Sequence, residues 1–492
     1  MTAVNGRISD IFLGKTDGAN EAKQVNFEDL FYDGDGWYDE LNETDKFLVT
    51  GRKGTGKSIL INYFSKKIKS KKNISEIYQT SRVMERKLSI IGNNRIKDEE
   101  MGAFWHFILL DFLLKLVLKE VRGSLFSRGK ELQKTVKELD FGLQNLMVTD
   151  KIDASIGANS NHGISANIGG VSEETKQFNK IEYYDKIDEL QDALFKVIKN
   201  SRKNFYMIFD DLDELSSKFA GKEYFIKMIK SFLTELKNFN EDLYSYDLSS
   251  KVIATLRTDV INQLQIEGSN LAKLTKDSAI EMKWSSPRQK TDPWTVPIAK
   301  MVLNKIRVSL PEYKTLNNRE LYKLFFEDNT KRKLEKTAID YILQNSFGRP
   351  RDIVLFLSDY KKMFPEDNRF GYRKLTQSLG EFSKDFYNEL QNEMSISSLK
   401  DEQLEFLDKI RNSKVREYTF EEINNLLYNG EKEKEKLEKL ITSLYKLGIL
   451  GVVKGDRGNK TYEFYYRDGA PEQPSFANRF LLHAAIKRYL SI

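Results

Sequence analysis

The chain of 492 residues contains no cysteine and only three histidines. The absence of cysteine excludes disulfide bonds, thiolate zinc sites and cysteine nucleophiles, and it suits a reducing compartment. The histidines, at positions 106, 162 and 483, lie far apart in the sequence. We therefore expect neither a histidine-rich metal site nor a catalytic triad that depends on histidine.

Long apolar runs are also scarce. The strongest candidate for a membrane span, residues 103–118 (AFWHFILLDFLLKLVL), contains His106, Asp111 and Lys115. A span needs ~20 apolar residues with few charges, so we predict a buried core helix here. The N-terminus, MTAVNGRISDIF, lacks the basic-then-apolar pattern of a signal peptide. These features predict a soluble, cytoplasmic protein without a membrane partner.

Neither sign of charge dominates, because the chain has 79 Lys and Arg residues and 73 Asp and Glu residues, for a net charge of +6. So small an excess over this length does not imply a nucleic-acid partner. Hydrophobic residues make up 40% of the chain and aromatic residues 12%, enough to bury a proper core. At ~150 residues per domain, the length predicts two to four domains.

The most informative stretch is residues 47–58, FLVTGRKGTGKS. Its apolar, β-prone start predicts a buried strand, and G-x-x-x-x-G-K-S is the P-loop pattern. Glycines let successive backbone N–H groups point at phosphate oxygens, and the following helix offers its positive N-terminal end. A chance match or a structural glycine turn is the alternative, but strand and helix flank the pattern. The predicted ATP-binding residues are Gly51, Arg52, Lys53, Gly54, Thr55, Gly56, Lys57, Ser58 and Ile59, with Lys57 also acting in catalysis and Ser58 also a Mg²⁺ ligand.

A second apolar run ends in acids at residues 205–214, FYMIFDDLDE. A continuous apolar run predicts a buried parallel strand, and carboxylates at its C-terminal end face the ligand crevice of an α/β sheet. This is the expected Walker B strand. We predict that Asp210 completes the Mg²⁺ shell and that Asp211 polarises the attacking water, with Glu214 as the alternative base. A strand leading into an acidic helix N-terminus is the competing interpretation.

Three further apolar runs complete a predicted parallel sheet of about five strands, at residues 46–50, 74–80, 205–209, 252–256 and 279–284. The run VIATLR ends in Arg257, which on a strand beside Walker B can sense the γ-phosphate and act in catalysis. A surface arginine at a strand end is the alternative. Residues 84–200 form an insertion, helical over 84–150, and a Ser-, Gly- and Asn-rich stretch at 151–180 permits a hairpin with a flexible tip.

From about residue 293 the chain is predicted to be helical, with amphipathic stretches at 297–307, 320–326 and 337–345. The segment FGRPRDIVLFL then breaks one helix and opens another. Arg351 falls in the first turn of that new helix, where it opposes the helix dipole. Because helix stability does not explain this arginine, we predict that Arg351 contacts a nucleotide phosphate.

Residues 400–492 have the order of a winged helix: three helices, at 403–410, 420–427 and 437–447, and then a hairpin. The third helix and its lead-in carry Lys432, Lys434, Lys436, Lys439 and Lys446 against Glu431, Glu433, Glu435 and Glu438. This balance is a poor electrostatic footprint for DNA. Contact with protein, or packing within the chain, is therefore favoured over contact with DNA. The tail, 474–492, is predicted to contain an amphipathic helix with Phe480, Leu481, Ala484, Ile486 and Leu490 on one side.

GRKGTGKS, IFDDLDEL, VIATLRTD and GRPRDIV, in that order and before a winged-helix-like end, resemble the AAA+/STAND side of the P-loop ATPases. The resemblance implies an α/β P-loop NTPase core, a helical lid domain and a winged-helix-like C-terminal domain, with ATP and Mg²⁺ as cofactors. We place the N-terminal lead-in at 1–45, the core at 46–290, the lid at 291–399 and the last domain at 400–492.

The order of motifs is also similar to bacterial stand-alone ATPases linked to mobile elements and phage defence. It implies an ATP-hydrolysing regulatory switch that forms homo-oligomers or acts with a partner effector in antiphage defence. A DNA-binding AAA+ ATPase of replication, transposition or repair is the alternative. Two features depart from the resemblance: the long insertion before Walker B, and the lack of a recognisable effector domain or repeat sensor.

Overall fold

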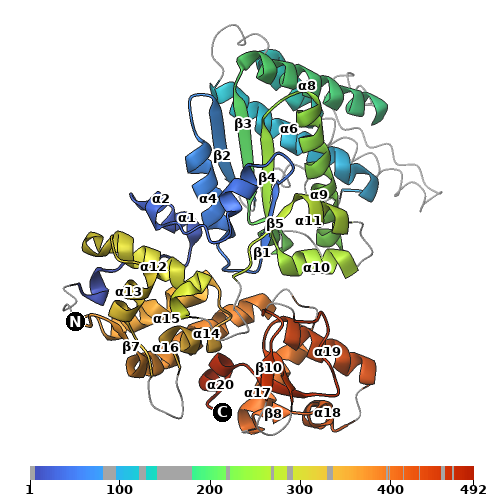
Figure 1. The fold of residues 1–492 in the computed structure, drawn as a ribbon. Helices are drawn as coiled ribbons and strands as arrows, with labels where there is room; N and C mark the ends of the chain where they lie inside the picture. The colour runs from blue at the N-terminus through green and yellow to red at the C-terminus, as the bar shows by residue number, and fades with distance from the viewer. Residues whose placement is uncertain are drawn as a thin grey trace, which may run out of the picture. The chain divides into compact units, whose positions relative to one another are not determined.

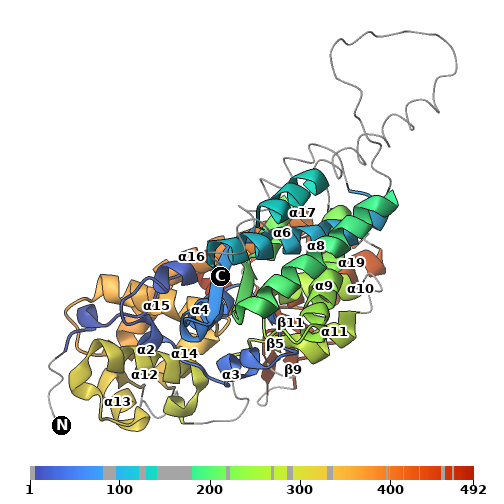
Figure 2. The ribbon, with the colours of Figure 1, turned by 90° about the horizontal axis from the view of Figure 1, so that it is seen from above.

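The computed structural model describes residues 6–80, 96–120, 129–140, 180–217, 222–266, 271–284, 292–329, 336–394, 397, 399–413, 415–430, 433–455, 460–467 and 470–492 (Figures 1 and 2). The chain forms two compact units. The sheet unit consists of Gly36–Arg52 and Leu60–Met282, and the helical unit of Met1–Asp35, Lys53–Ile59 and Lys283–Ile492.

The sheet unit is built on five parallel strands in the order β2-β3-β4-β1-β5. The predicted α/β class and the five predicted strands are confirmed. Because all the strands run in parallel, the C-terminal ends of β1, β3 and β4 lie at one edge of the sheet. The bounds are β1 (Leu48–Gly51), β2 (Asn73–Gln79), β3 (Asn204–Asp210), β4 (Lys251–Arg257) and β5 (Ala279–Glu281).

Long helices in the sheet unit supply its hydrophobic core. The apolar run at 103–118 is a core helix as predicted, and the Trp105 indole N–H donates to the Met228 carbonyl at 3.0 Å. Within the described residues, only this helix with its lead-in, Asp98–Glu120, is long and apolar enough to cross a membrane, and 72% of its most apolar window is buried. The stretch 151–180 with its predicted hairpin lies outside the described residues except for Lys180. The helices are α3 (Trp37–Asn42), α4 (Lys57–Ile68, which starts in the helical unit), α6 (Met101–Glu120), α8 (Lys180–Ser201), α9 (Lys222–Ser245), α10 (Thr258–Ile266) and α11 (Leu271–Ser278).

The helical unit contains the predicted helices after residue 293 and one long helix that was not predicted, α16 (Tyr372–Met394). Pro297 and Pro350 each occupy a first helical turn, where the missing N–H costs nothing. The described part of the N-terminal lead-in up to Asp35 packs onto this unit as an arm, tied by the buried ion pair of Glu21 and Lys305. The other helices are α1 (Gly18–Glu21), α2 (Phe27–Leu30), α12 (Pro297–Ser309), α13 (Asn318–Phe325), α14 (Ala338–Gln344) and α15 (Pro350–Met363), and a short parallel pair joins β6 (Phe326–Glu327) to β7 (Phe370–Gly371).

The end of the chain has the predicted winged-helix order, and it shares one hydrophobic core with α12–α16. Thr419 caps α18 as its sequence position suggests, accepting from the Glu422 N–H at 3.1 Å. The hairpin of β9 and β10 is antiparallel and belongs to a four-stranded sheet. The elements are α17 (Lys400–Ser413), β8 (Glu417–Tyr418), α18 (Phe420–Tyr428), α19 (Lys434–Lys446), β9 (Leu450–Lys454), β10 (Thr461–Glu463), β11 (Arg479–Leu482) and α20 (Ala484–Leu490).

The tail prediction was wrong at Phe480 and Leu481, which lie in strand β11 rather than in a helix. This strand pairs with β9 on one side and β8 on the other. The backbone hydrogen bonds of two neighbouring strands therefore outweigh the local helical spacing of the apolar residues. The helix α20 begins only at Ala484, after the N-cap His483.

Candidate nucleotide-binding site

The P-loop of this chain joins β1 to α4, with Lys57 as the first residue of the helix. Gly54 and Gly56 have φ angles of +84° and +100°, a backbone region that glycine enters without strain. At Gly54 space is limiting too, since an added Cβ would lie 2.9 Å from the Arg351 Cβ. The sequence pattern and the backbone therefore agree that these two positions require glycine.

Three consecutive carbonyls of the loop are bound by side-chain or backbone donors of the helical unit. Arg349 donates to the Lys53 carbonyl at 2.9 Å, the Arg351 N–H donates to the Gly54 carbonyl at 3.2 Å, and the Trp284 indole donates to the Thr55 carbonyl at 2.9 Å. In a planar trans peptide the following N–H points opposite to the carbonyl. The three N–H groups that follow these carbonyls therefore point away from the donors that bind the carbonyls. An anion-binding loop requires N–H groups that are oriented in this manner.

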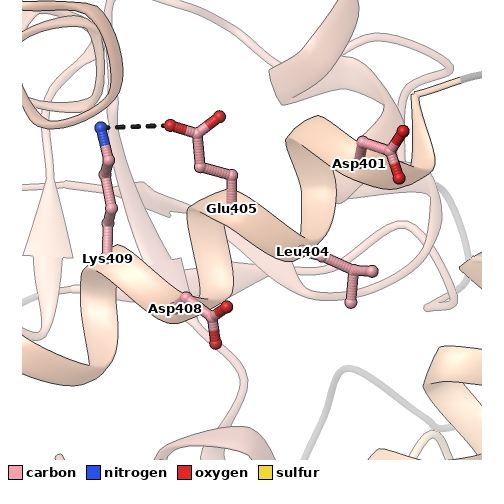
Figure 3. Close-up of a pocket in the computed structure, with 5 residues that line it drawn as sticks. All are labelled: Asp401, Leu404, Glu405, Asp408 and Lys409. Atoms are coloured by element: carbon pink, nitrogen blue, oxygen red, sulfur yellow. Dashed lines mark ion pairs between the residues drawn. The ribbon is translucent and has the colours of Figure 1, made fainter.

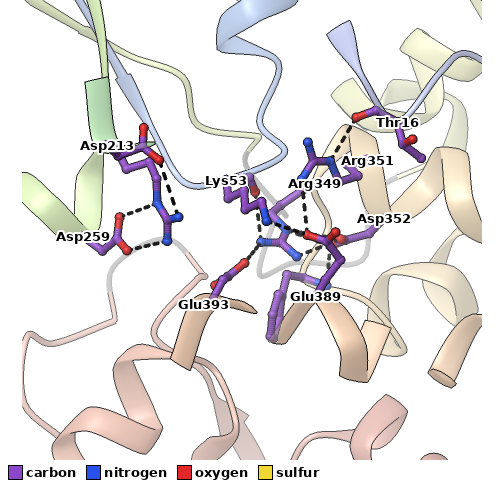
Figure 4. Close-up of polar contacts among 11 residues, drawn as sticks. Thr16, Lys53, Asp213, Asp259, Arg349, Arg351, Asp352, Glu389 and Glu393 are labelled. Atoms are coloured by element: carbon purple, nitrogen blue, oxygen red, sulfur yellow. Dashed lines mark hydrogen bonds and ion pairs between the residues drawn. The ribbon is translucent and has the colours of Figure 1, made fainter. Parts of the chain in front are cut away.

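Arg349 is the most deeply buried cation beside the loop, with its side chain 6% exposed. It contacts Asp352 at 2.9 Å and Glu393 at 2.6 Å (Figure 4). Burial alone would lower the pKa of Arg349, but the charges and hydrogen bonds of these two carboxylates more than reverse that effect and raise it. Arg351 was predicted as a site residue, and Arg349 was not. The spacing of Arg349 and Asp352, three residues apart across a helix start, was the available signal.

Arg351 lies in the first turn of α15 as predicted, and it has protein partners there. Its guanidinium contacts the Glu389 carboxylate at 3.3 Å and donates to the Thr16 carbonyl at 3.2 Å. The same carboxylate contacts the Lys53 ammonium at 3.1 Å. An arginine at this position therefore does not by itself require a phosphate, and its contact with a nucleotide stays a prediction.

The acidic end of β3 is held by hydroxyl groups of the sheet unit. The Thr255 hydroxyl on β4 donates to the Asp210 carboxylate at 2.6 Å and accepts from the Asp211 N–H at 3.2 Å. The Thr80 hydroxyl donates to the Asp210 carbonyl, also at 2.6 Å. Asp211 adopts φ +57°, a left-handed conformation that few residues other than glycine, asparagine and aspartate accept. Such backbone conformations concentrate at functional sites.

Arg257 ends β4, beside β3 as the predicted role requires. Its guanidinium makes a bidentate contact with Asp259 at 2.9 and 2.6 Å and approaches Asp213 at 3.7 Å (Figure 4). The side chain is only 7% exposed, so the alternative of a surface arginine does not hold. Glu214 lies in the short 3₁₀ helix Leu212–Ser217 that follows. The catalytic roles of Arg257, Asp211 and Glu214 stay predictions.

Magnesium requires few protein ligands at a nucleotide site, because phosphate oxygens and waters supply the rest. The hydroxyl of Ser58 and the carboxylate of Asp210 are each an oxygen donor of the type that Mg²⁺ prefers, so each residue fits the ion by its own chemistry. Among the described residues, no group of three or more histidine, aspartate or glutamate side chains is arranged to hold a metal ion by itself.

A hollow lies on α17, in the winged-helix part of the chain (Figure 3). Its charged side chains include one ion pair, between Lys409 and Glu405 at 3.2 Å. No residue of the P-loop lines it, so we assign it no part in nucleotide binding. The lining residues are Asp401, Leu404, Glu405, Asp408 and Lys409.

Comparison with known proteins gives little beyond this geometry. No protein-family model and no curated protein matches the chain. Among solved structures, the chain is similar to that of the Aeropyrum pernix ORC1 protein in complex with DNA, with 11% identity over 96% of this chain and 95% of that one and a TM-score of 0.37. This likeness is distant, and the fold described above rests on the strand and helix order of this chain.

Proposed function

We propose that this chain is an AAA+-type ATPase that binds and hydrolyses ATP with Mg²⁺. The observation that carries the proposal is the loop between β1 and α4, whose sequence is G-x-x-x-x-G-K-S and whose glycines take the backbone angles that phosphate binding needs. The outward-held carbonyls of Lys53, Gly54 and Thr55 support it, because they leave the next N–H groups pointing the other way.

The proposed roles of the side chains follow from their chemistry. Lys57 neutralises the β- and γ-phosphates, and Ser58 and Asp210 hold the Mg²⁺ ion. Asp211 positions the attacking water, with Glu214 as the alternative, and Arg257 senses the γ-phosphate. Bound Mg²⁺ supplies charge neutralisation at the phosphates.

We further propose that nucleotide binding and hydrolysis change the arrangement of the domains, so that the protein acts as a regulatory switch. The hydrogen bond from the Arg351 N–H of α15 to the Gly54 carbonyl of the P-loop supports this, because a phosphate that enters the loop changes the surroundings of Arg351. Oligomer formation, a partner effector, a cytoplasmic location and a role in bacterial antiphage defence are the finer parts of the proposal. They rest on the order of the sequence motifs.

DNA binding is the second candidate function, and the winged-helix order of residues 400–492 favours it. The charges of the third helix oppose it, because each lysine of α19 lies within ion-pair distance of a glutamate. A neutralised helix releases few counterions from DNA. The pairs are Lys434–Glu438 at 3.8 Å, Lys436–Glu433 at 3.0 Å, Lys439–Glu435 at 2.7 Å and Lys446–Glu472 at 3.3 Å.

Binding of labelled ATP to the Lys57→Ala variant tests the central claim. Loss of one charge-assisted phosphate contact, worth about 1.5–3 kcal/mol, should weaken binding roughly 10- to 150-fold. Lys66→Ala, at the exposed end of the same helix, is the matched control and should bind as the wild type does. Equal affinity in the wild type and Lys57→Ala would refute nucleotide binding at this loop. Filter binding of DNA at two salt concentrations separates the second candidate, since DNA binding should weaken steeply with salt.

A further inference from the structure

Glu389 on α16 bridges two cations that belong to different elements. Its Oε2 atom lies 3.1 Å from the Lys53 ammonium of the P-loop and 3.3 Å from the Arg351 guanidinium of α15 (Figure 4). One carboxylate oxygen thus serves a loop cation and a helix cation together. A phosphate oxygen makes the same kind of contact with arginine and lysine.

The ion pairs of Glu389 are more exposed than the neighbouring cluster around Arg349, so their partners can be replaced more readily. Arg349, Asp352 and Glu393 form a closed cluster with side chains 3–6% exposed. The side chains of Lys53, Arg351 and Glu389 are 23–29% exposed. Partly exposed ion pairs contribute little to stability, so an anion of higher charge can replace one partner at small cost. The buried cluster keeps α15 in place while the exposed bridge is free to open.

We propose that Glu389 is a built-in competitor of the nucleotide phosphates. Without nucleotide it holds Lys53 and Arg351, and a nucleotide that binds at the P-loop must take these cations from it. The inference rests on the proposed function, because it assumes that ATP binds at this loop. It assigns a regulatory role to a residue outside every sequence motif: Glu389 lowers the affinity for ATP.

Release of Glu389 would also affect the winged-helix part, because aromatic side chains of α16 pack against rings of that part. Phe386 stacks on His483 with ring centroids 5.2 Å apart, and Tyr387 stacks on Tyr489 at 4.1 Å. Phe386 and Tyr387 lie on α16 within one turn of Glu389. A shift of α16 that follows loss of the bridge therefore reaches α20.

The test is the dissociation constant for labelled ATP in three variants of the full chain. Glu389→Gln removes the charge, and Glu389→Asp keeps the charge but shortens the side chain so that it no longer reaches both cations. Asp385→Asn, one turn earlier on α16, removes a charge without touching the bridge. We expect roughly two- to tenfold tighter binding for both Glu389 variants and wild-type affinity for Asp385→Asn.

Two outcomes would overturn the inference. One is unchanged or weaker ATP binding in Glu389→Gln and Glu389→Asp. The other is equal tightening in Glu389→Gln and Asp385→Asn with none in Glu389→Asp, which would mean that only the overall charge matters. A wild-type protein that binds ATP no better than Lys57→Ala would instead refute the proposed function, so the two failures are distinguishable.

Discussion

Arg349 donates a 2.9 Å hydrogen bond to the backbone carbonyl of Lys53, a P-loop residue 296 positions earlier in the chain. The same guanidinium is held by Asp352 and Glu393, so α15 and α16 together fix one peptide of the loop. The shape of the loop therefore depends on helices far away in sequence, as well as on its own glycines.

The Arg349 cluster is expected to stabilise the fold. Arg349→Met would leave the carboxylates of Asp352 and Glu393 buried without their cation, at a cost of about 3–5 kcal/mol in the free energy of unfolding. Arg351→Met, which removes a partly exposed ion pair, should cost about 0–1 kcal/mol. Urea unfolding of both variants measures the difference. Similar losses in the two variants would contradict the assignment of Arg349 as the buried anchor.

Substitutions of Asp210 and Asp211, at the end of β3, should impair different steps of the reaction. Asp210→Asn should weaken Mg²⁺-dependent ATP binding, because it removes a metal ligand. Asp211→Asn should keep binding and slow hydrolysis, and asparagine also tolerates the left-handed backbone at this position. Single-turnover hydrolysis with matched ATP-binding assays measures both. Normal hydrolysis in Asp211→Asn together with slow hydrolysis in Glu214→Gln would move the water-positioning role to Glu214.

Thr255 is expected to position Asp210 through its hydroxyl group. Thr255→Val removes the donor to the Asp210 carboxylate and the acceptor of the Asp211 N–H, and should destabilise the protein by about 1–3 kcal/mol. It should also raise the Mg²⁺ concentration needed for half-maximal hydrolysis. Thr255→Ser keeps the hydroxyl and should restore the Mg²⁺ dependence of the wild type. A serine variant as impaired as the valine variant would show that the methyl packing matters instead.

His483 should make the protein sensitive to acid. Burial, followed by the positive charge of Arg467, lowers the pKa of His483 from 6.5 to about 3. The unfolded chain therefore binds this proton as the pH falls through 6.5, while the folded chain does not, and stability falls with decreasing pH. The expected loss between pH 7 and pH 5 is about 2 kcal/mol.

The control for this prediction is His483→Asn, because asparagine is also a good N-cap residue but does not titrate. Urea unfolding at pH 7 and pH 5 gives the change in stability for each protein. The loss should be smaller in the variant by about 2 kcal/mol. Equal losses in the two proteins would assign the acid sensitivity to other groups.

The strands of the sheet unit, the P-loop and several helix starts were predictable from sequence because their signals are local. Runs such as FYMIF are apolar at every position, and only a strand covered on both faces explains them. The glycines of the P-loop and the N-cap Thr419 also act within a few residues of themselves. Strand positions, the loop and several helix starts therefore followed from the order of residues alone.

The tertiary structure decided which polar groups meet. Arg349 and Arg351 stand two residues apart in one motif, yet only Arg349 is deeply buried, because Glu393 and the Lys53 carbonyl lie on its side of α15. Phe480 lies in a strand because its backbone pairs with Tyr418 of β8 on one side and Val452 of β9 on the other. Burial of a charge and pairing of a strand depend on partners distant in sequence, and no local pattern contains them.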